Sequence, residues 1–316
     1  MTKIASDAQL WDLLRGALTA RALGLAADLG VAEALAEGPR PVGELAAERG
    51  ADADTLHRLL RALASDGVFA EEEPGVFRNT PASELLRTGW GSFAHLFGGV
   101  FHRTAGALDA SGKPAFPTAF GTDFWSYLAA DPGERAAFDR AMEQGKERRA
   151  TTLAKLAWRG DERVVDVGGG NGSLLVELRR EHPGLRGVVL DLPETVRDED
   201  ALAAAGIEFV EGNFFERVPP ADVYILGTIL HDWPDEESAA ILGTIRESAP
   251  PGARVLIVDS VVQPGNEPQG AKWLDLLMLA FAGGRERTED EWRGLVDRAG
   301  LELAALEDGL IEARCP

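Results

Sequence analysis

Apolar residues in the first 90 positions recur every three or four residues, which is the spacing of one face of an α-helix. The pattern predicts a helical stripe over 10–31, a short helix over Val42–Arg49, and a longer helix that Asp52 or Asp54 begins as its N-cap. A small hairpin is predicted around Pro74–Gly75. Helix, turn, helix and hairpin is the order of a winged helix, so DNA binding, partner binding and dimerisation are all open at this point.

Residues 91–158 also have a helical pattern, and they are rich in aromatic side chains. Core packing is the expected role of most of these aromatic residues. Phe138 and Met142 are four positions apart and therefore share one helix face. We interpret this pair as a lid over a flat apolar ligand.

From Arg163 onward, short β-rich runs alternate with helical segments such as 174–181 and 236–248. Strands are predicted at 164–167, 187–190, 207–210, 223–226, 254–259, near 303–306 and at 310–313. Strands that alternate with helices are typical of a Rossmann-like, doubly wound and mostly parallel sheet, here with seven strands. Ligands of such α/β folds bind beyond the carboxyl ends of the strands.

Charge argues against the DNA-binding interpretation of the N-terminal pattern. The chain has 32 Lys and Arg against 52 Asp and Glu, a net charge of −20. Residues 1–90 alone carry 9 basic and 14 acidic residues. Nucleic acids and anionic membranes attract cationic surfaces, so neither is expected as a partner, and partner binding or dimerisation is the favoured role of the winged helix.

The single cysteine, Cys315, excludes an internal disulfide and a cysteine-based metal cluster, and it favours a reducing cytoplasm. No uncharged stretch reaches the roughly 18 to 20 residues of a membrane span. The first residues also lack the apolar core of a signal peptide. We therefore expect a cytoplasmic protein.

The end of the first predicted strand carries the strongest local motif. Asp166 is followed by Gly168, Gly169 and Gly170, and Gly172 precedes a predicted helix. Glycines let a backbone turn sharply and approach a ligand where a Cβ atom would clash. The spacing D-x-G-x-G-x-G is neither the dinucleotide fingerprint nor a phosphate loop.

The next two strand ends add groups that suit a nucleoside. Asp191, followed by Leu192, stands where a carboxylate can accept hydrogen bonds from both hydroxyls of a ribose. Asn213 and Phe214 end the third strand, where the amide can contact an adenine edge and the ring can pack on its face. Together the three strand ends predict the binding of an adenosine that lacks a pyrophosphate.

The segments VVDVGGGNGSLL, VVLDLPETV, FVEGNFF, LHDWPDEE and GGRERTEDEW resemble the class I S-adenosylmethionine-dependent methyltransferases. Within these, the chain is most similar to the O-methyltransferases of the plant phenolic and bacterial natural-product type. The resemblance covers nearly the whole sequence. It implies an all-helical, winged-helix-like dimerisation domain over 1–100, a catalytic domain over 101–316 with substrate-lining helices at 101–158, and a homodimer.

The same resemblance implies S-adenosylmethionine as cofactor, S-adenosylhomocysteine as its product, Asp191 as the ribose ligand, and Asn213 and Phe214 as adenine contacts. Two positions differ from the family pattern. Family members often have Asp where this chain has Asn213, so a different hydrogen bond to adenine is expected. Plant members carry a Lys where this chain has Gly227.

His231 follows the fourth predicted strand in the segment GTILHDWP. A lone histidine before Asp-Trp-Pro often caps a turn, but a neutral imidazole here is suited to remove the proton of an acceptor hydroxyl. It acts best when its other nitrogen donates to a carboxylate. Asp259, after the fifth strand, and Glu286, in GGRERT, stand where the family keeps such partners. We predict His231, Asp259 and Glu286 as the catalytic group.

Substrate contacts are predicted on the segment 273–281, where core packing is an equal alternative for every residue except Met278. Met278 falls where the family places a pocket methionine, and together with Met142 it would sandwich an aromatic ring. Asp232 has two interpretations, as a helix cap before Pro234 or as a substrate contact. The histidines are scattered and no acidic grouping has metal-ligand spacing, so metal-independent chemistry is predicted.

The sequence therefore predicts an enzyme that transfers a methyl group from S-adenosylmethionine to a hydroxyl of an aromatic or polyketide-type small molecule. Two enzymatic alternatives stay open: a relative redirected to hydroxylation or decarboxylation, and an N-methyltransferase. A third alternative is a regulator that senses S-adenosylmethionine and binds DNA through the winged helix, although the required basic face is missing.

Overall fold

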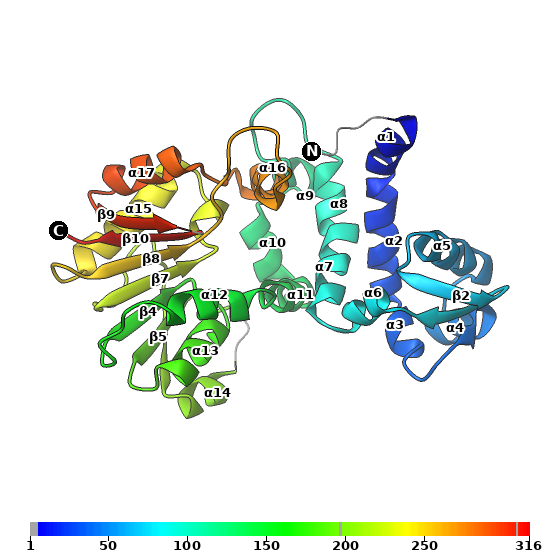
Figure 1. The fold of residues 1–316 in the computed structure, drawn as a ribbon, viewed down its shortest axis with the longest axis horizontal. Coiled ribbons are helices and arrows are strands. Elements are labelled where there is room, and N and C mark those ends of the chain that lie inside the picture. Colours follow the sequence, from blue (N-terminus) through cyan, green and yellow to red (C-terminus); the bar gives the residue numbers. More distant parts are fainter. Residues whose placement is uncertain (1–5, 196–197, 308) are drawn as a thin grey trace. The chain divides into compact units, whose positions relative to one another are not determined.

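The computed structural model describes residues 6–195, 198–307 and 309–316 (Figure 1). Its chain divides into two compact units. The N-terminal unit runs to Gly106 and includes Ala136–Gln144, whereas the second unit consists of Ala107–Arg135 and Gly145–Pro316. No helix among the described residues is both long and apolar enough to span a membrane.

The N-terminal unit combines helices with a small three-stranded sheet of order β1-β3-β2. Its strands are β1 (Arg40–Pro41), β2 (Phe69–Glu73) and β3 (Val76–Asn79). Its helices are α1 (Asp7–Leu14), α2 (Gly16–Asp28), α3 (Val31–Ala34), α4 (Val42–Arg49), α5 (Ala53–Ser65), α6 (Pro81–Glu84), η1 (Leu85–Arg87), α7 (Gly89–Gly98) and α8 (Val100–Ala105). The predicted hairpin is confirmed, and β1 adds a third strand that the sequence pattern did not indicate.

Local sequence signals explain where α5 begins and ends. Asp52 is its N-cap, because its side chain accepts a hydrogen bond from the backbone N–H of Thr55. Gly67 follows the helix with a φ of 79°, a conformation that favours glycine. The apolar face of α5 buries Leu56, Leu60 and Leu63 in the core of the unit.

The predicted stripe over 10–31 is two helices rather than one, because α1 ends at Leu14 and α2 begins at Gly16. α2 packs closely on α7, since a Cβ atom on Gly24 would lie 2.8 Å from the Cα atom of Gly98. The large apolar side chains at the start of the stripe remain exposed; they are Leu10, Trp11, Leu13, Leu14 and Leu18. This part of the stripe therefore does not pack into the core of its own chain.

The second unit is built on a seven-stranded sheet of order β6-β5-β4-β7-β8-β10-β9. Its strands are β4 (Arg163–Val167), β5 (Arg186–Asp191), β6 (Ile207–Glu211), β7 (Val223–Gly227), β8 (Arg254–Val258), β9 (Glu302–Glu307) and β10 (Leu310–Arg314). The first five are parallel, and β10 runs antiparallel to both β8 and β9. All seven predicted strands and the doubly wound fold are confirmed.

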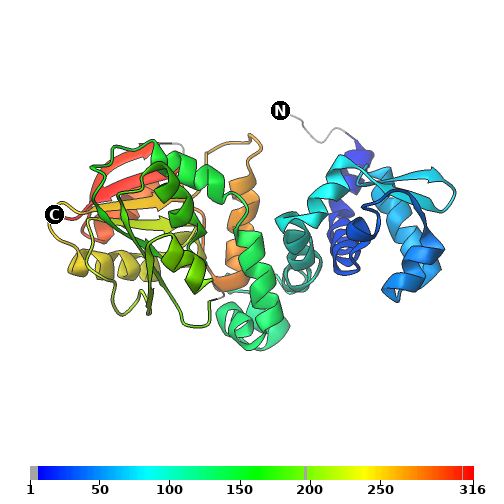
Figure 2. The same cartoon turned by 90° about the horizontal axis from the view of Figure 1, so that it is seen from below.

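Helices cover both faces of this sheet (Figures 1 and 2). One core cluster joins the sheet to α12 (Lys146–Ala154), α13 (Ser173–Glu181) and α14 (Glu199–Ala204). The other joins it to α15 (Asp235–Ser248) and α17 (Glu289–Arg298). Because both faces are covered, the central strands β4 and β7 are mostly buried and apolar, and each is followed by a polar segment at its carboxyl end.

The remaining helices are α9 (Phe116–Phe120), α10 (Phe124–Ala130), α11 (Pro132–Met142) and α16 (Gly270–Ala282). The backbone N–H of Ala115, just before α9, donates to the carbonyl oxygen of Ala280 on α16. Phe116 and Phe124 are buried as the core interpretation predicts. Phe97 is an exception, because it is 43% exposed, and Trp90, just before this segment, is 51% exposed.

Candidate active site

The glycine loop after β4 turns back so tightly that only glycine fits at its first position. Gly168 has a φ of 70°, and a Cβ atom there would lie 2.6 Å from Cδ1 of Ile229. The same Cβ atom would lie 3.5 Å from Cε1 of Phe214. The loop after β4, the end of β6 and the segment after β7 therefore meet at one point, as the strand order predicts.

Asp191 ties the end of β5 to this loop. Its Oδ2 atom accepts a hydrogen bond of 2.7 Å from the backbone N–H of Gly170. Its Oδ1 atom accepts from the backbone N–H of Leu192 and from the hydroxyl of Thr195. The carboxylate is thus held in a fixed orientation at the carboxyl edge of the sheet, next to the glycine loop.

Asn213 uses its amide oxygen within its own turn. Its Oδ1 atom accepts a hydrogen bond of 3.0 Å from the backbone N–H of Phe215. The amide nitrogen is consequently the group of this side chain that is available to donate to a ligand. Phe214 packs next to it, with its ring centroid 6.1 Å from that of Trp233 in an edge-to-face arrangement.

Asp166 lies beneath the loop, where it is 2% exposed. Its Oδ2 atom is buried and has no hydrogen-bond partner among the described residues. Burial raises the pKa of Asp166 to about 7; Arg149 opposes this shift and Asp191 adds to it. A buried carboxylate oxygen without a partner beside a glycine loop marks a place where a ligand can supply a donor.

Arg149, on α12, also lies near Asp166 and the glycine loop, and it was not predicted from the sequence. A Cβ atom on Gly227 would lie 3.8 Å from Cδ of Arg149. Burial lowers the pKa of this guanidinium, and the charges of Asp166 and Asp259 act in the opposite direction. The absence of a side chain at Gly227 was the only signal in the sequence, and it did not indicate which residue approaches.

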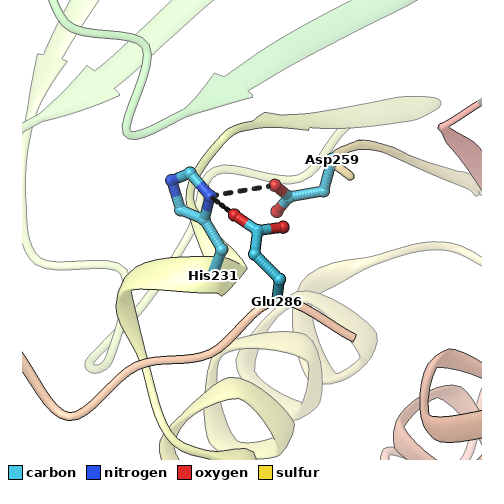
Figure 3. A group of neighbouring side chains, drawn as sticks. All are labelled: His231, Asp259 and Glu286. Atoms are coloured by element: carbon cyan, nitrogen blue, oxygen red, sulfur yellow. Dashed lines mark hydrogen bonds and ion pairs between the residues drawn. The ribbon is translucent and has the colours of Figure 1, made fainter. Parts of the chain in front are cut away.

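His231 lies in a short 3₁₀ turn, η2 (Leu230–Asp232), which begins three residues after the end of β7. The residue is buried, and its Nδ1 atom is 2.7 Å from Oε1 of Glu286 and 3.2 Å from Oδ1 of Asp259 (Figure 3). The other ring nitrogen, Nε2, points away from both carboxylates (Figure 3). The structure thus brings together the three residues predicted as the catalytic group.

The carboxylates set the protonation behaviour of the imidazole. Burial alone lowers the pKa of His231, but the charges of Asp259, Asp232 and Glu286 outweigh burial and raise that pKa to about 10. Burial also raises the pKa of Asp259, with His231 opposing the shift and Glu286 adding to it. A proton that reaches this imidazole is therefore strongly stabilised.

The loop that carries Glu286 also holds the turn that carries His231. A Cβ atom on Gly284 would lie 2.1 Å from the carbonyl oxygen of His231, so the two backbones are in direct contact. Arg287 is fully buried, and its guanidinium donates to the carbonyl oxygens of Leu230 and Trp233. These contacts fix the backbone on both sides of His231.

Asp232 does not cap α15, whose N-cap is Pro234 without a side-chain hydrogen bond. Its Oδ1 atom lies 3.6 Å from Nε2 of His231 instead. Burial raises the pKa of Asp232 to about 7; His231 opposes the shift, and the other two carboxylates add to it. The helix-cap interpretation is therefore wrong, and a substrate contact stays a prediction.

The predicted substrate residues belong to different units. Met278 lies on α16 of the catalytic unit. Phe138 and Met142 lie one turn apart in the part of α11 that belongs to the N-terminal unit. The shared helix face of this pair is confirmed, and the sandwich with Met278 stays a prediction.

His231, Asp259 and Glu286 each offer a ligand atom, and these atoms lie within 4.8 Å of one another. The fold therefore assembles a grouping that the sequence spacing did not indicate. The Nδ1 atom already has a carboxylate at hydrogen-bond distance, so the arrangement is explained without an ion. Metal-independent chemistry stays a prediction.

Two family models match the chain. The model of the O-methyltransferase domain matches residues 101–302, and the model of the O-methyltransferase dimerisation domain matches residues 11–89. The chain belongs to the O-methyltransferase family. The resemblance inferred from the sequence motifs is thereby confirmed.

The O-methyltransferase is 38% identical to the phenazine O-methyltransferase PhzM of Lysobacter antibioticus, over 93% of this chain and 90% of that protein. Its fold matches the crystal structure of LaPhzM with a TM-score of 0.91 at 36% identity, covering 98% and 99% of the two chains. It matches NcsB1, an O-methyltransferase from neocarzinostatin biosynthesis, with a TM-score of 0.80 at 33% identity, covering 94% and 96%. That structure contains S-adenosylmethionine and 2-hydroxy-5-methyl naphthoic acid.

Proposed function

We propose that this O-methyltransferase transfers a methyl group from S-adenosylmethionine to a hydroxyl of an aromatic or polyketide-type small molecule, with His231 as general base. One observation carries the proposal. The buried imidazole has two carboxylates at Nδ1 and directs Nε2 away from them, at the same edge of the sheet as the glycine loop. The structures and names of the relatives support the cofactor and the aromatic substrate class.

The residues at the strand ends fit the cofactor. Asp191 would accept from the ribose hydroxyls, the amide nitrogen of Asn213 would donate to an adenine ring nitrogen, and Phe214 would pack on the adenine. Leu192 and the backbone of Gly168, Gly169 and Gly170 would line the nucleoside. The unpartnered Oδ2 atom of Asp166 suits an ammonium group, and Arg149 suits a carboxylate. S-adenosylmethionine supplies the electrophilic methyl group when bound.

The chain's own contribution to the chemistry is proton removal. A phenolic hydroxyl has a pKa near 10 and is a weak nucleophile until its proton is removed. The Nε2 atom of a neutral His231 would accept that proton, and Glu286 and Asp259 would stabilise the resulting imidazolium at Nδ1. Because the carboxylates raise the pKa of His231, the neutral imidazole is a stronger acceptor for the phenolic proton than an isolated histidine.

The proposal is tested by His231→Ala and His231→Gln. Cofactor affinity, measured by calorimetry, is expected to stay within a few-fold of the wild-type value, because His231 lies outside the proposed nucleoside site. Turnover is expected to fall by about 10²–10⁴-fold, the typical contribution of general-base catalysis. An unchanged kcat in either variant would remove His231 from the mechanism.

Asp232 and Met278 of the catalytic unit would contact the acceptor with a carboxylate and a polarisable sulfur. Phe138 and Met142 stay predicted acceptor contacts from the sequence. A mass-spectrometric screen of phenols, hydroxynaphthoates and polyketides would identify the acceptor as the compound that gains one methyl group. S-adenosylhomocysteine formed in step with that product would exclude the hydroxylation and decarboxylation alternatives. An amine panel in the same screen would reveal N-methylation.

The enzyme would act as a homodimer through its N-terminal unit. The match to a dimerisation domain and the exposed leucines of α1 and α2 support this assembly. The net charge of −20 supports the prediction that nucleic acids and membranes are not partners. A cytoplasmic location stays a prediction from the single cysteine.

A further inference from the structure

We propose that Asp275 is a positioning residue that holds Glu286 in place for His231, an inference that rests on the proposed role of His231 as base. Asp275 lies on α16, and Glu286 lies in the loop between α16 and α17. The backbone N–H of Glu286 donates a hydrogen bond of 2.9 Å to Oδ1 of Asp275. The side chain of the same Glu286 reaches Nδ1 of His231 at 2.7 Å.

The path of the chain explains how this contact forms. α16 ends at Ala282, and Gly283, with a φ of 76°, reverses the backbone. The chain then returns along α16, so that Glu286 meets a residue that precedes it by 11 positions. α16 is itself anchored near its end, because the carbonyl oxygen of Ala280 accepts from the backbone N–H of Ala115.

The neighbours of Glu286 are held by other contacts. The backbone N–H of Arg285 donates to the carbonyl oxygen of His231 at 2.9 Å, and the carbonyl oxygen of Arg287 accepts from Val262 at 2.9 Å. Asp275 holds the peptide N–H of Glu286 itself. It therefore fixes the rotation of the one peptide group that sets the direction of the catalytic carboxylate.

The hydrogen bond between Asp275 and the backbone N–H of Glu286 is expected to affect turnover. Glu286 is 3% exposed, so its N–H would be buried without an acceptor if Asp275 were removed. The peptide would then rotate toward another acceptor, and the carboxylate would move with it. Displacements of about 1 Å in a catalytic arrangement can lower rates by 10²-fold. The contact between Glu286 and His231 would weaken without any change in the nucleoside site.

The test is a double-mutant cycle between Asp275→Ala and Glu286→Ala. In the wild-type background, Asp275→Ala is expected to lower kcat by about 10- to 100-fold, while KM for the cofactor changes less than about 2-fold. In the Glu286→Ala background, the same change is expected to lower kcat by less than about 2-fold, because the carboxylate it positions is gone. Asp297→Ala removes an exposed carboxylate from α17 and is the matched control.

A conservative variant separates positioning from general stability. Asp275→Asn keeps an acceptor at Oδ1, so it is expected to retain several-fold more turnover than Asp275→Ala. Asp275→Ala is also expected to shift the pH at which kcat is half maximal in the same direction as removal of Glu286. A purely structural role would lower kcat without moving that midpoint.

Three results would overturn the inference: a wild-type kcat in folded Asp275→Ala, an equal loss in the presence and absence of the Glu286 side chain, or an unchanged pH midpoint. If Asp275→Ala does not fold, the cycle is made with Asp275→Asn, for which a small loss confined to the wild-type background is expected. Failure of the proposed base role of His231 can be told apart from failure of the positioning role of Asp275, because only in the first case would His231→Ala keep the wild-type turnover.

Discussion

The backbone N–H of Arg285 donates to the carbonyl oxygen of His231 at 2.9 Å. This contact lays the backbone segment that carries Glu286 directly beside the turn that carries the imidazole. The distance between Glu286 and His231 is therefore set by two adjacent backbones as well as by side-chain packing. The first two predictions concern this arrangement.

Gly284→Ala is expected to damage the active site, because its Cβ atom would lie 2.1 Å from the carbonyl oxygen of His231. One of the two backbones must shift to remove this clash. The shift should lower the free energy of unfolding by about 1–3 kcal/mol and lower kcat by at least 10-fold. Gly243→Ala on α15 meets nothing within 4 Å and is the control. It should raise stability by about 0.5–1 kcal/mol at unchanged kcat. Denaturant unfolding and turnover assays measure both effects; equal behaviour of the two variants would contradict the prediction.

Glu286→Gln is expected to shift the pH dependence of turnover toward lower pH. The wild-type carboxylates raise the pKa of His231 to about 10, so kcat should rise with pH as the imidazole loses its proton. Removing one negative charge lowers the pKa of His231, and the rise then occurs at lower pH. The maximal kcat should fall by about 10- to 100-fold, because the imidazolium is less stabilised. A pH profile of kcat with an unshifted midpoint would argue against electrostatic coupling of the pair.

Asp166→Asn is expected to flatten the pH dependence of stability. The folded-state pKa of Asp166 is raised to about 7, well above its unfolded value near 4. The folded protein therefore binds this proton more tightly than the unfolded chain does. The contribution of Asp166 to the free energy of unfolding decreases as pH rises from about 4 to about 7, by at most about 4 kcal/mol. Urea unfolding at pH 5 and pH 8 should show a smaller decrease in the variant than in the wild type. Asp297→Asn, at an exposed site, should behave like the wild type.

Leu18→Glu is expected to disrupt the proposed homodimer. Leu18 is 73% exposed on α2, in the apolar stripe that does not pack into the core of its own chain. A carboxylate there would be buried without a partner in an apolar interface, which is strongly unfavourable. Light scattering should give the monomer mass for this variant and the dimer mass for Arg58→Ala, which changes the charge equally at an exposed site on α5. A monomeric wild-type enzyme would contradict the assembly.

Structural features that depend on residues close together in the sequence could be predicted from the sequence. The seven strands of the catalytic unit and the N-cap at Asp52 depend on residues within a few positions of one another, and all are present. The glycine loop and Asp191 were placed correctly because parallel strands bring their carboxyl ends to one edge of the sheet. The family motifs added the catalytic group that spacing alone could not assemble.

By itself, then, the sequence determined the elements of the fold, the strand ends that carry polar groups and the family, because each of these follows from local periodicity or from contiguous motifs. Only the tertiary structure decided that Arg149 lies beside Gly227 and that Asp232 faces the imidazole instead of capping α15. It also decided that Asp275 holds Glu286. The physical reason is the same in each case: these contacts depend on how loops turn and how buried charges share a site, and neither has a periodic signature along the chain.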